Sequence, residues 1–353
     1  MANTPLRILK STRENWSENL ADETIEHHPI LALLKAGGRL KTNCDGTDLK
    51  WTILYKERGL IPYADFDDLS FIRQDLLQTA TLDTRGYKMV DAISEKEMLQ
   101  NKGKHAIIKL FGKMADDMKK NAGTRLCAEF YVDGNATGNS KRLSGLETMM
   151  SMTGQTAADR EATTLNDTYA GLSTAKGAYG GAQGDRHFDF WSPMIVSTNA
   201  TGYTWAANAD QHLRYAITQM TRSQMKDESL DLIQLTRSAY REFVDLLSTT
   251  ERVIVNKEDV GIRKFGFKDV VSFDGVDVTF DPDIPATDAN SDVVSGYGFT
   301  TGKMEYCLLG DSLWHASGDD FDVTRQCFTW WVGNYGNLRF QSPRHFAKFV
   351  ALA

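Results

Sequence analysis

A long ribbon of alternating apolar and polar residues constrains this sequence more than any other feature. Residues 48–91 predict a β-hairpin, because Leu49, Trp51 and Ile53 alternate with polar side chains in the period-two pattern of a half-buried strand. A return strand is expected over residues 77–90. The tip between the two strands carries seven apolar residues: Leu60, Ile61, Tyr63, Phe66, Leu69, Phe71 and Ile72.

A two-stranded ribbon is marginal in water and cannot bury so many apolar groups by itself. The hairpin therefore packs either on its own domain or across a neighbouring subunit. For the second alternative, the candidate inter-subunit contacts are Trp51, Tyr55, Leu60, Ile61, Tyr63, Phe66 and Phe71.

Residues 94–131 predict one long helix. Ser94 and Glu97 form a capping box, which satisfies free N–H groups at a helix start. Apolar residues recur at helical spacing along one face: Ile107, Leu110, Phe111, Met114, Ala115 and Met118. A helix of this length would span roughly 55 Å at 1.5 Å per residue, which exceeds the diameter of a small domain. We therefore expect a structural spine.

The flanking stretches predict an arm and a loop. Residues 1–45, which contain one short apolar segment at residues 29–34, predict an N-terminal arm. Residues 151–190 are rich in Gly, Ala and Thr and predict an irregular, mobile loop.

The second half of the chain predicts a compact α/β region followed by strands. Helices are expected at 208–225 and 238–247, and strands at 230–235 and 252–256. Asp274-Gly275 predicts a hairpin turn, because glycine tolerates the positive φ that such turns need. The C-terminal third predicts mostly strands, with a turn at 333–337.

The composition is that of an ordinary folded protein. The 353 residues suffice for two or three compact regions, and the net charge of −7 provides no global basic field for nucleic acid. The four cysteines lack C-x-x-C spacing and predict reduced thiols in a cytoplasmic compartment. The N-terminus lacks the apolar core of a signal peptide, and no apolar run approaches the roughly 20 residues that span a bilayer.

No motif predicts catalysis. Residues 296–304 approach a phosphate-binding loop, but Tyr297 occupies the first glycine position and Met304 replaces the metal-binding hydroxyl, so we interpret them as a turn. Ser173 and Lys176 match S-x-x-K without a K-T-G partner. The Asp-rich loop 281–292 lacks the spacing of an EF-hand, which favours a solvated loop over a Ca²⁺ site.

The histidines and aromatic residues predict packing more than binding. His27-His28 has no nearby partner with metal-ligand spacing, and the other histidines have none either. The aromatic residues Trp330, Trp331 and Tyr335 could stack on single-stranded nucleic acid, but core or interface packing is the better interpretation in an acidic chain. We therefore expect no enzyme, no cofactor and no metal site.

Three segments carry a family resemblance: residues 230–247, which include L-D-L-I-Q-L, residues 266–285, which include S-F-D-G-V-D-V-T-F, and residues 319–350, which end P-R-H-F-A-K-F-V. In these segments and in its order of parts, the chain resembles the major capsid proteins of tailed bacteriophages, of the Hong Kong 97 type. The resemblance extends along nearly the whole chain.

The resemblance implies an α+β fold of four parts. They are an N-terminal arm (1–45), an extended E-loop hairpin (46–92), a peripheral P-domain with the spine helix (93–150 and 315–342) and an axial A-domain (151–314 and 343–353). It also implies hexamers and pentamers of the chain itself in an icosahedral head around double-stranded DNA. The implied location is the virion capsid, after assembly in the host bacterial cytoplasm.

The further partners that the resemblance implies are a separate scaffolding protein, a portal, a maturation protease and a decoration protein. Some capsid proteins of this type join subunits by a lysine–asparagine bond. Lys50, Lys56 and Lys88 lie in the hairpin, and Asn334 and Asn337 in the terminal strands, but nothing pairs them, so we predict no such bond.

Two other functions stay open at this point. An encapsulin-like shell shares the fold and would hold protein cargo instead of DNA. A soluble enzyme with an active site formed only in the folded chain would instead be a low-order oligomer with a deep polar pocket.

Overall fold

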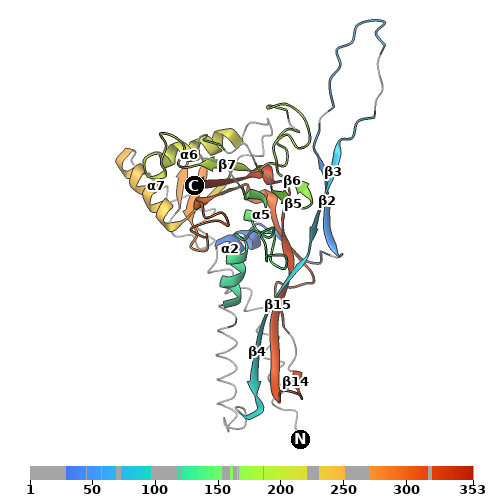
Figure 1. Ribbon diagram of the computed structural model, residues 1–353, viewed down its shortest axis with the longest axis vertical. Helices are drawn as coiled ribbons and strands as arrows, with labels where there is room; N and C mark the ends of the chain where they lie inside the picture. Colours follow the sequence, from blue (N-terminus) through green and yellow to red (C-terminus); the bar gives the residue numbers. More distant parts are fainter. Residues whose placement is uncertain are drawn as a thin grey trace.

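The computed structural model is elongated. Figure 1 shows a central body, from one end of which the hairpin of β2 (Asp48–Leu54) and β3 (Leu77–Asp83) projects, while β4 (Arg85–Ser94) and β15 (Cys327–Phe340) extend from the other. The residues described are 29–44, 46–56, 58–68, 73–96, 118, 121–152, 160–161, 165, 167–185, 187–220, 230–250, 270–316 and 320–352.

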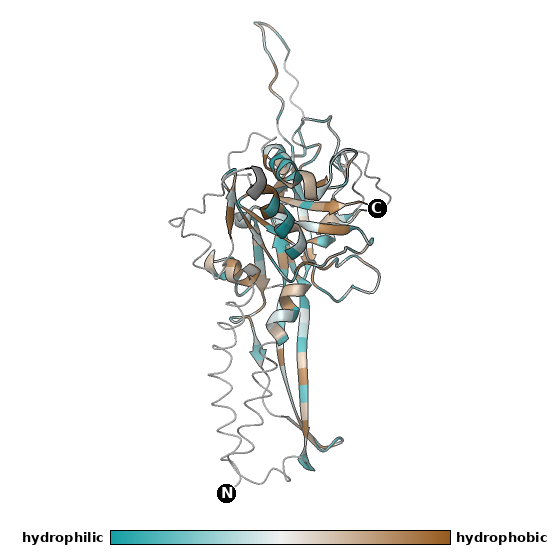
Figure 2. Ribbon diagram, turned by 90° about the vertical axis from the view of Figure 1, so that its left-hand side faces the viewer, coloured by the Kyte–Doolittle hydropathy of each residue, from teal (hydrophilic) through white to brown (hydrophobic). Residues whose placement is uncertain are grey.

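One sheet is organised around β15, a strand of 14 residues. One edge of β15 pairs antiparallel with β4 over ten residue pairs. The other edge pairs in succession with β14 (Asp320–Asp322), β13 (His315–Ala316) and β12 (Met304–Leu308), and β1 (Leu40–Lys41) adds to β12 in parallel. In Figure 2, apolar and polar residues alternate along the long strands below the body.

The turn predicted at residues 333–337 is wrong, because these residues lie inside β15. Gly336, one of the glycines that suggested a turn, is required for a different reason. A Cβ on Gly336 would overlap the backbone of Cys307 on β12, so this position requires close approach of two strands.

A second sheet has the strand order β7-β16-β11-β8-β10-β9. Its strands are β7 (Met194–Ser197), β8 (Leu232–Leu235), β9 (Val271–Phe273), β10 (Val276–Phe280), β11 (Val293–Phe299) and β16 (Phe346–Ala351). The helices α6 (Trp205–Met220) and α7 (Arg237–Thr250) contact each other and cover one face (Figure 1). The predicted helix–strand–helix region is thereby confirmed, whereas the strand predicted at 252–256 lies outside the described residues.

The hairpin turn predicted at Asp274-Gly275 is confirmed. β9 and β10 pair antiparallel, and the two turn residues have φ of 48° and 82°. Positive φ at both central positions is the geometry whose twist matches that of the flanking strands.

The predicted long hairpin is confirmed for its first strand and for the return strand up to Asp83. β2 and β3 pair from Asp48–Asp83 to Leu54–Leu77. The return strand does not continue to residue 90, because Arg85–Ser94 forms β4 and pairs with β15 instead. Residues that we assigned to the hairpin thus join the first sheet, as does β12, which we placed in the axial region.

Residues 29–41 of the predicted arm form a helix and a short strand, and they pack on the body of the molecule. The helix α2 (Pro29–Ala36) buries Leu31 and Leu34 completely, and β1 follows it in the first sheet. Of the predicted spine helix, residues 121–129 are helical and place Ala122 and Leu126 in the same core as α2. The N-terminal part of that helix, with Glu97 of the capping box, lies outside the described residues.

The Gly-rich loop is irregular, as predicted, but it is packed. It forms the two-residue strands β5 (Thr168–Tyr169) and β6 (Leu172–Ser173), and α5 (Glu147–Met150) precedes it. The Tyr169 hydroxyl donates to the Leu338 carbonyl at 3.1 Å and accepts from the Phe340 N–H at 2.9 Å. These bonds attach the loop to the end of β15.

Two apolar cores meet at β16. Phe346 and Val350 belong to the core shared with the first sheet, whereas Ala347 and Phe349 belong to the core beneath α6 and α7. Because side chains alternate between the faces of a strand, one strand serves both cores. The short 3₁₀ turns η3 (Thr301–Lys303) and η4 (Pro343–His345) precede β12 and β16.

Candidate inter-subunit surface

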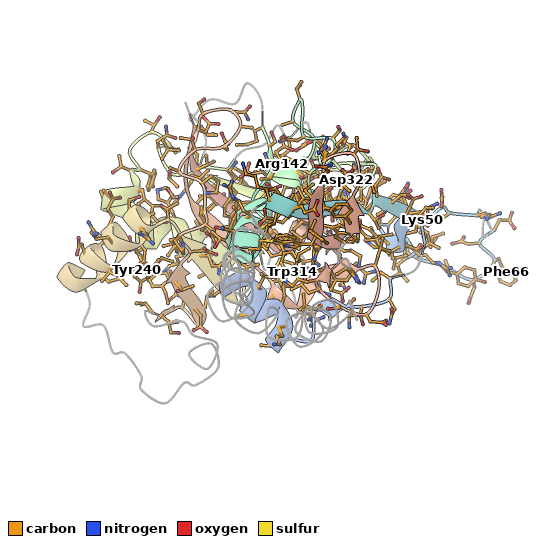
Figure 3. All side chains as sticks on the ribbon, turned by 90° about the horizontal axis from the view of Figure 1, so that it is seen from below. Lys50, Phe66, Arg142, Tyr240, Trp314 and Asp322 are labelled. Carbon is orange, nitrogen blue, oxygen red and sulfur yellow. The ribbon has the colours of Figure 1, made fainter. Side chains whose placement is uncertain are left out.

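The hairpin tip, residues 58–68, exposes large apolar side chains. The exposed fractions are 98% for Leu60, 61% for Ile61, 59% for Tyr63 and 101% for Phe66. Figure 3 shows Phe66 at the far end of the hairpin, away from the body. The other predicted tip residues, Leu69, Phe71 and Ile72, lie outside the described residues. The sequence analysis thus identified an apolar surface that the described part of the chain does not cover.

The turn at the tip holds Phe66 in an unfavourable backbone conformation. The Asp67 N–H donates to the Ala64 carbonyl at 3.1 Å, which closes a four-residue turn, and Phe66 occupies its third position with φ of 72°. That position favours glycine, because a side chain with positive φ is sterically strained. Within the single chain, a phenylalanine at this position neither buries its ring nor adopts a favourable backbone conformation.

Trp51 and Tyr55 lie elsewhere, at the root of the hairpin. The Trp51 ring packs 6.4 Å, centroid to centroid, from both Tyr169 and Trp191, and its Nε1 donates to the Gln341 carbonyl at 3.1 Å. Tyr55 packs at 5.5 Å from Phe190. These two residues pack within their own chain and do not belong to the tip surface. Their contact with a neighbouring subunit stays a prediction.

A second exposed apolar group lies at the opposite end of the molecule. Val90 on β4 is 73% exposed, Val323 after β14 is 77% exposed, and Phe321 on β14 is 43% exposed although its ring lies 5.0 Å from that of Phe328. We did not single out these residues from the sequence. The sequence D-F-D-V at residues 320–323, in which an apolar residue lies between two charged ones, could have indicated these exposed apolar side chains.

A buried ionic network joins α5 and the loop before β11 to β16 of the second sheet. The Nζ of Lys348 on β16 is 2.7 Å from Glu147 Oε2 on α5 and 2.8 Å from Asp288 Oδ2, and the three side chains are at most 4% exposed. The Tyr297 hydroxyl donates to Glu147. Burial raises the pKa of Glu147. Burial also lowers the pKa of Lys348, but the two carboxylates outweigh it and leave that pKa above its ordinary value.

This network corrects the interpretation of residues 281–292 as a solvated loop. Asp281 is 2% exposed and accepts a hydrogen bond from the Tyr131 hydroxyl at 2.8 Å, and Asp288 pairs with Lys348. Two buried contacts thus anchor this loop. Among the described residues, no group of three His, Cys, Asp or Glu side chains has the geometry of a metal site.

The motif-like segments have structural roles. Residues 296–304, which we interpreted as a turn, instead comprise most of β11, the turn η3 and the start of β12. Lys176 of the S-x-x-K match pairs with Glu161 at 2.6 Å. That pair lines a small polar cleft, where Arg344 also lies 3.7 Å from Asp189. Acids and bases in this cleft therefore neutralise one another.

The aromatic residues of β15 are packed rather than arranged as a stacking platform. Trp330 is 4% exposed and directs its Nε1 to Met118 Sδ at 3.2 Å. Lys88 on β4 covers the Trp331 ring, with Nζ 4.4 Å from its centroid. The packing that we favoured for these residues over nucleic-acid stacking is confirmed.

The asparagines considered for a cross-link are occupied within the chain. Asn334 and Asn337 are fully buried. The Nδ2 of Asn334 donates to the Leu313 carbonyl at 2.7 Å, and that of Asn337 donates to the Asp83 carbonyl at 2.7 Å. Both side chains therefore serve to hold β15 in the first sheet.

Among the described residues, no helix combines the length and the apolar character that crossing a membrane requires. The cysteines Cys44, Cys127, Cys307 and Cys327 are free thiols.

Comparisons with known proteins identify the fold. No family model matches the chain, and no curated protein sequence matches it. The capsid structure of cyanophage A-1(L) matches with a TM-score of 0.58 and 15% identity, over 92% of this chain and 91% of that chain.

Two further capsids give the same result. The capsid of the native GTA particle matches with a TM-score of 0.54 and 11% identity, over 91% of this chain and 90% of that chain. The capsid of the Myoviridae phage XM1 matches with a TM-score of 0.52 and 13% identity, over 91% and 92%. The chain therefore has the α+β, Hong Kong 97-like fold of tailed-phage capsid proteins.

Proposed function

We propose that this chain is a major capsid protein, which assembles into the hexamers and pentamers of an icosahedral phage head enclosing double-stranded DNA. The observation that carries the proposal is a capsid fold that covers about nine-tenths of both chains in each comparison. The function is then structural rather than enzymatic, and self-association is the activity of the molecule.

The hairpin tip supplies the first inter-subunit contact of this proposal. Leu60 and Phe66 are almost completely exposed, and Phe66 also has a strained backbone. Full burial of one such side chain contributes about 1.5–3 kcal/mol. Repetition by symmetry then stabilises a closed shell although each contact is weak. We propose that the tip packs across a neighbouring subunit, with Ile61 and Tyr63 in the same contact.

The remaining partners follow from the same proposal. The sheet of β15 corresponds to the peripheral domain, and the sheet covered by α6 and α7 corresponds to the axial domain. A scaffolding protein, a portal and a decoration protein would act on the assembled chain. With a net charge of −7, packaged DNA would be held only by weak, non-specific proximity. The proposed location is the virion, after assembly in the bacterial cytoplasm.

The test compares two substitutions of one residue. Phe66→Asp places a charge in the proposed contact, whereas Phe66→Leu keeps an apolar side chain there. Because Phe66 is fully exposed, both variants should unfold at the temperature of the parent chain. Sizing chromatography and electron microscopy should show closed shells, or rings of five and six subunits, for the parent chain and Phe66→Leu, and free subunits for Phe66→Asp.

Two results would count against this assignment. Normal shells from Phe66→Asp would remove the tip from the contact. A parent chain that stays a monomer or dimer at high concentration would remove the capsid function itself. Nucleic acid in shells produced in the native host distinguishes a phage head from an encapsulin-like compartment, in which protein cargo is expected.

A further inference from the structure

The Lys348 side chain contacts two carboxyl groups in a site that solvent does not reach. Its Nζ lies 2.8 Å from Asp288 Oδ2 and 2.7 Å from Glu147 Oε2. The lysine side chain is fully buried, and the two carboxyl side chains are at most 4% exposed. An amine and a carboxyl group that are held together away from water are the two reactants of amide formation, a reaction whose other product is water.

The two oxygens of the Asp288 carboxyl group have different surroundings. Oδ2 faces the lysine, whereas Oδ1 accepts the backbone N–H of Asn290 at 2.9 Å and the backbone N–H of Asp292 at 3.0 Å. The Asp288 N–H in turn donates to the Asp292 carbonyl at 3.0 Å, which closes the turn. Two backbone donors on one oxygen stabilise the negative charge that develops there when a nucleophile attacks the adjacent carbon.

Glu147 is placed to move protons at the same nitrogen. Its Oε2 contacts Lys348 Nζ, and its Oε1 accepts the Tyr297 hydroxyl. Burial raises the pKa of Glu147, so this carboxyl group can accept a proton and later return it. Burial lowers the pKa of Lys348, but the two carboxylates outweigh it, so the amine is charged before the reaction and must first lose a proton.

We propose that Lys348 and Asp288 condense to an intrachain amide bond, with Glu147 as the group that moves the protons. In the folded ion pair, Nζ first passes a proton to Asp288 Oδ2, which leaves a neutral amine and a neutral acid. The amine then attacks Asp288 Cγ, so that the N–C bond forms and Oδ1 takes the negative charge. Glu147 removes one proton from the nitrogen and delivers it to Oδ2. The Cγ–Oδ2 bond breaks, water leaves, and Oδ1 becomes the amide carbonyl oxygen.

The surroundings favour the bond over the ion pair. Two buried charges become one neutral amide, and burial penalises charged groups more than neutral ones. The reacting groups are already in contact, so the attack is intramolecular and has a high effective concentration. Because the bond forms only after folding, freshly folded chain contains the ionic network, and the bonded form accumulates with time. Both residues belong to one chain, and the reaction does not rest on the proposed function.

The test follows the mass of the full-length chain, denatured at intervals after refolding at neutral pH. The expected mass falls by one water molecule. Proteolysis should then give a branched pair of peptides joined through Asp288 and Lys348, and trypsin should no longer cleave after Lys348. Asp288→Asn should release ammonia instead of water, and it should therefore reach the same final mass as the parent chain.

Two further variants separate the roles of the residues. Glu147→Gln keeps both bonding residues but removes the group that moves protons, so it should retain the full mass of its sequence. Its melting curve shows whether it is folded. Lys176→Met is the matched control, because it removes a lysine from a more exposed ion pair, 2.6 Å from Glu161. This variant should lose one water molecule at the rate of the parent chain.

Three results would overturn the inference. A parent chain that keeps the full mass of its sequence would show that the network is an ion pair only. Loss of water from a peptide that lacks Lys348 would indicate cyclisation of an aspartate onto its own backbone. Loss of water at the parent rate from folded Glu147→Gln would exclude Glu147 from the proton transfer. If Glu147→Gln does not fold, the masses of the parent chain and of Asp288→Asn decide whether the bond forms.

Discussion

Substitution of Lys348 by methionine tests the buried ionic network that links β16 to α5 and to the loop before β11. Methionine keeps most of the apolar stem but removes the ammonium group that lies 2.7 Å from Glu147 and 2.8 Å from Asp288. Breaking a buried ion pair by removing one partner typically costs about 3–5 kcal/mol, because a charge is left buried without compensation. Two carboxylates lose their cation here, so we expect the upper part of that range at pH 7.

The loss should depend on pH. Burial already raises the pKa of Glu147, and removal of the nearby cation raises it further. The folded variant then binds a proton on the carboxyl pair more tightly than the unfolded chain does, so its stability increases as the pH falls from 7 to 5. Each proton taken up recovers up to about 1.4 kcal/mol per pH unit.

Urea denaturation of the unassembled chain measures this effect at both pH values. A matched control combines Lys348→Met with Glu147→Gln and Asp288→Asn, and should recover most of the lost stability because no buried charge remains. If Lys348→Met lost less than about 1 kcal/mol of stability, and lost it equally at pH 7 and pH 5, the ionic network would not stabilise the folded chain.

Three further substitutions have definite expected outcomes. Trp51→Glu should lower the free energy of unfolding by about 3 kcal/mol or more, because its ring packs on Tyr169 and Trp191; thermal unfolding equal to that of the parent chain would refute this. Burial raises the pKa of Asp167 to about 7, so the folded chain loses stability as the pH rises from about 4 to 7. Asp167→Asn should therefore make the melting temperature depend less on pH over this range. Gly275→Ala should cost about 1 kcal/mol, since φ is 82° there, and an unchanged denaturation midpoint would contradict the turn assignment.

The sequence predicted the elements whose signals are local. The strand at Trp51, the helix that contains Leu247 and the Asp274-Gly275 turn each depend on neighbours within a few residues, and all are present. The exposed tip with Leu60 was likewise visible, because a two-stranded ribbon cannot cover its own apolar residues. Periodicity and turn chemistry carry this information without knowledge of the tertiary structure.

What the sequence did not predict depends on contacts between distant residues. Gly333 and Gly336 signal a turn locally but lie within a long strand, since the approach of β12 requires a missing side chain at Gly336. Likewise, Asp288 belongs to a sequence typical of solvated loops, and only the tertiary structure brings Lys348 to it. The division of the return strand near Asp83 depends on β15, more than 200 residues later in the chain.

Side chains alternate between the two faces of β16, and this alternation favours one register of the strand during folding. A slip of one residue against β11 and β7 would move Lys348 into the apolar core beneath α6 and α7, and would place Phe349 beside the carboxylates of Glu147 and Asp288. Both errors are costly at once, one as a buried unpaired cation and the other as two carboxylates without a partner. A single lysine thereby destabilises the shifted registers of a strand that is otherwise apolar enough to pair in more than one register.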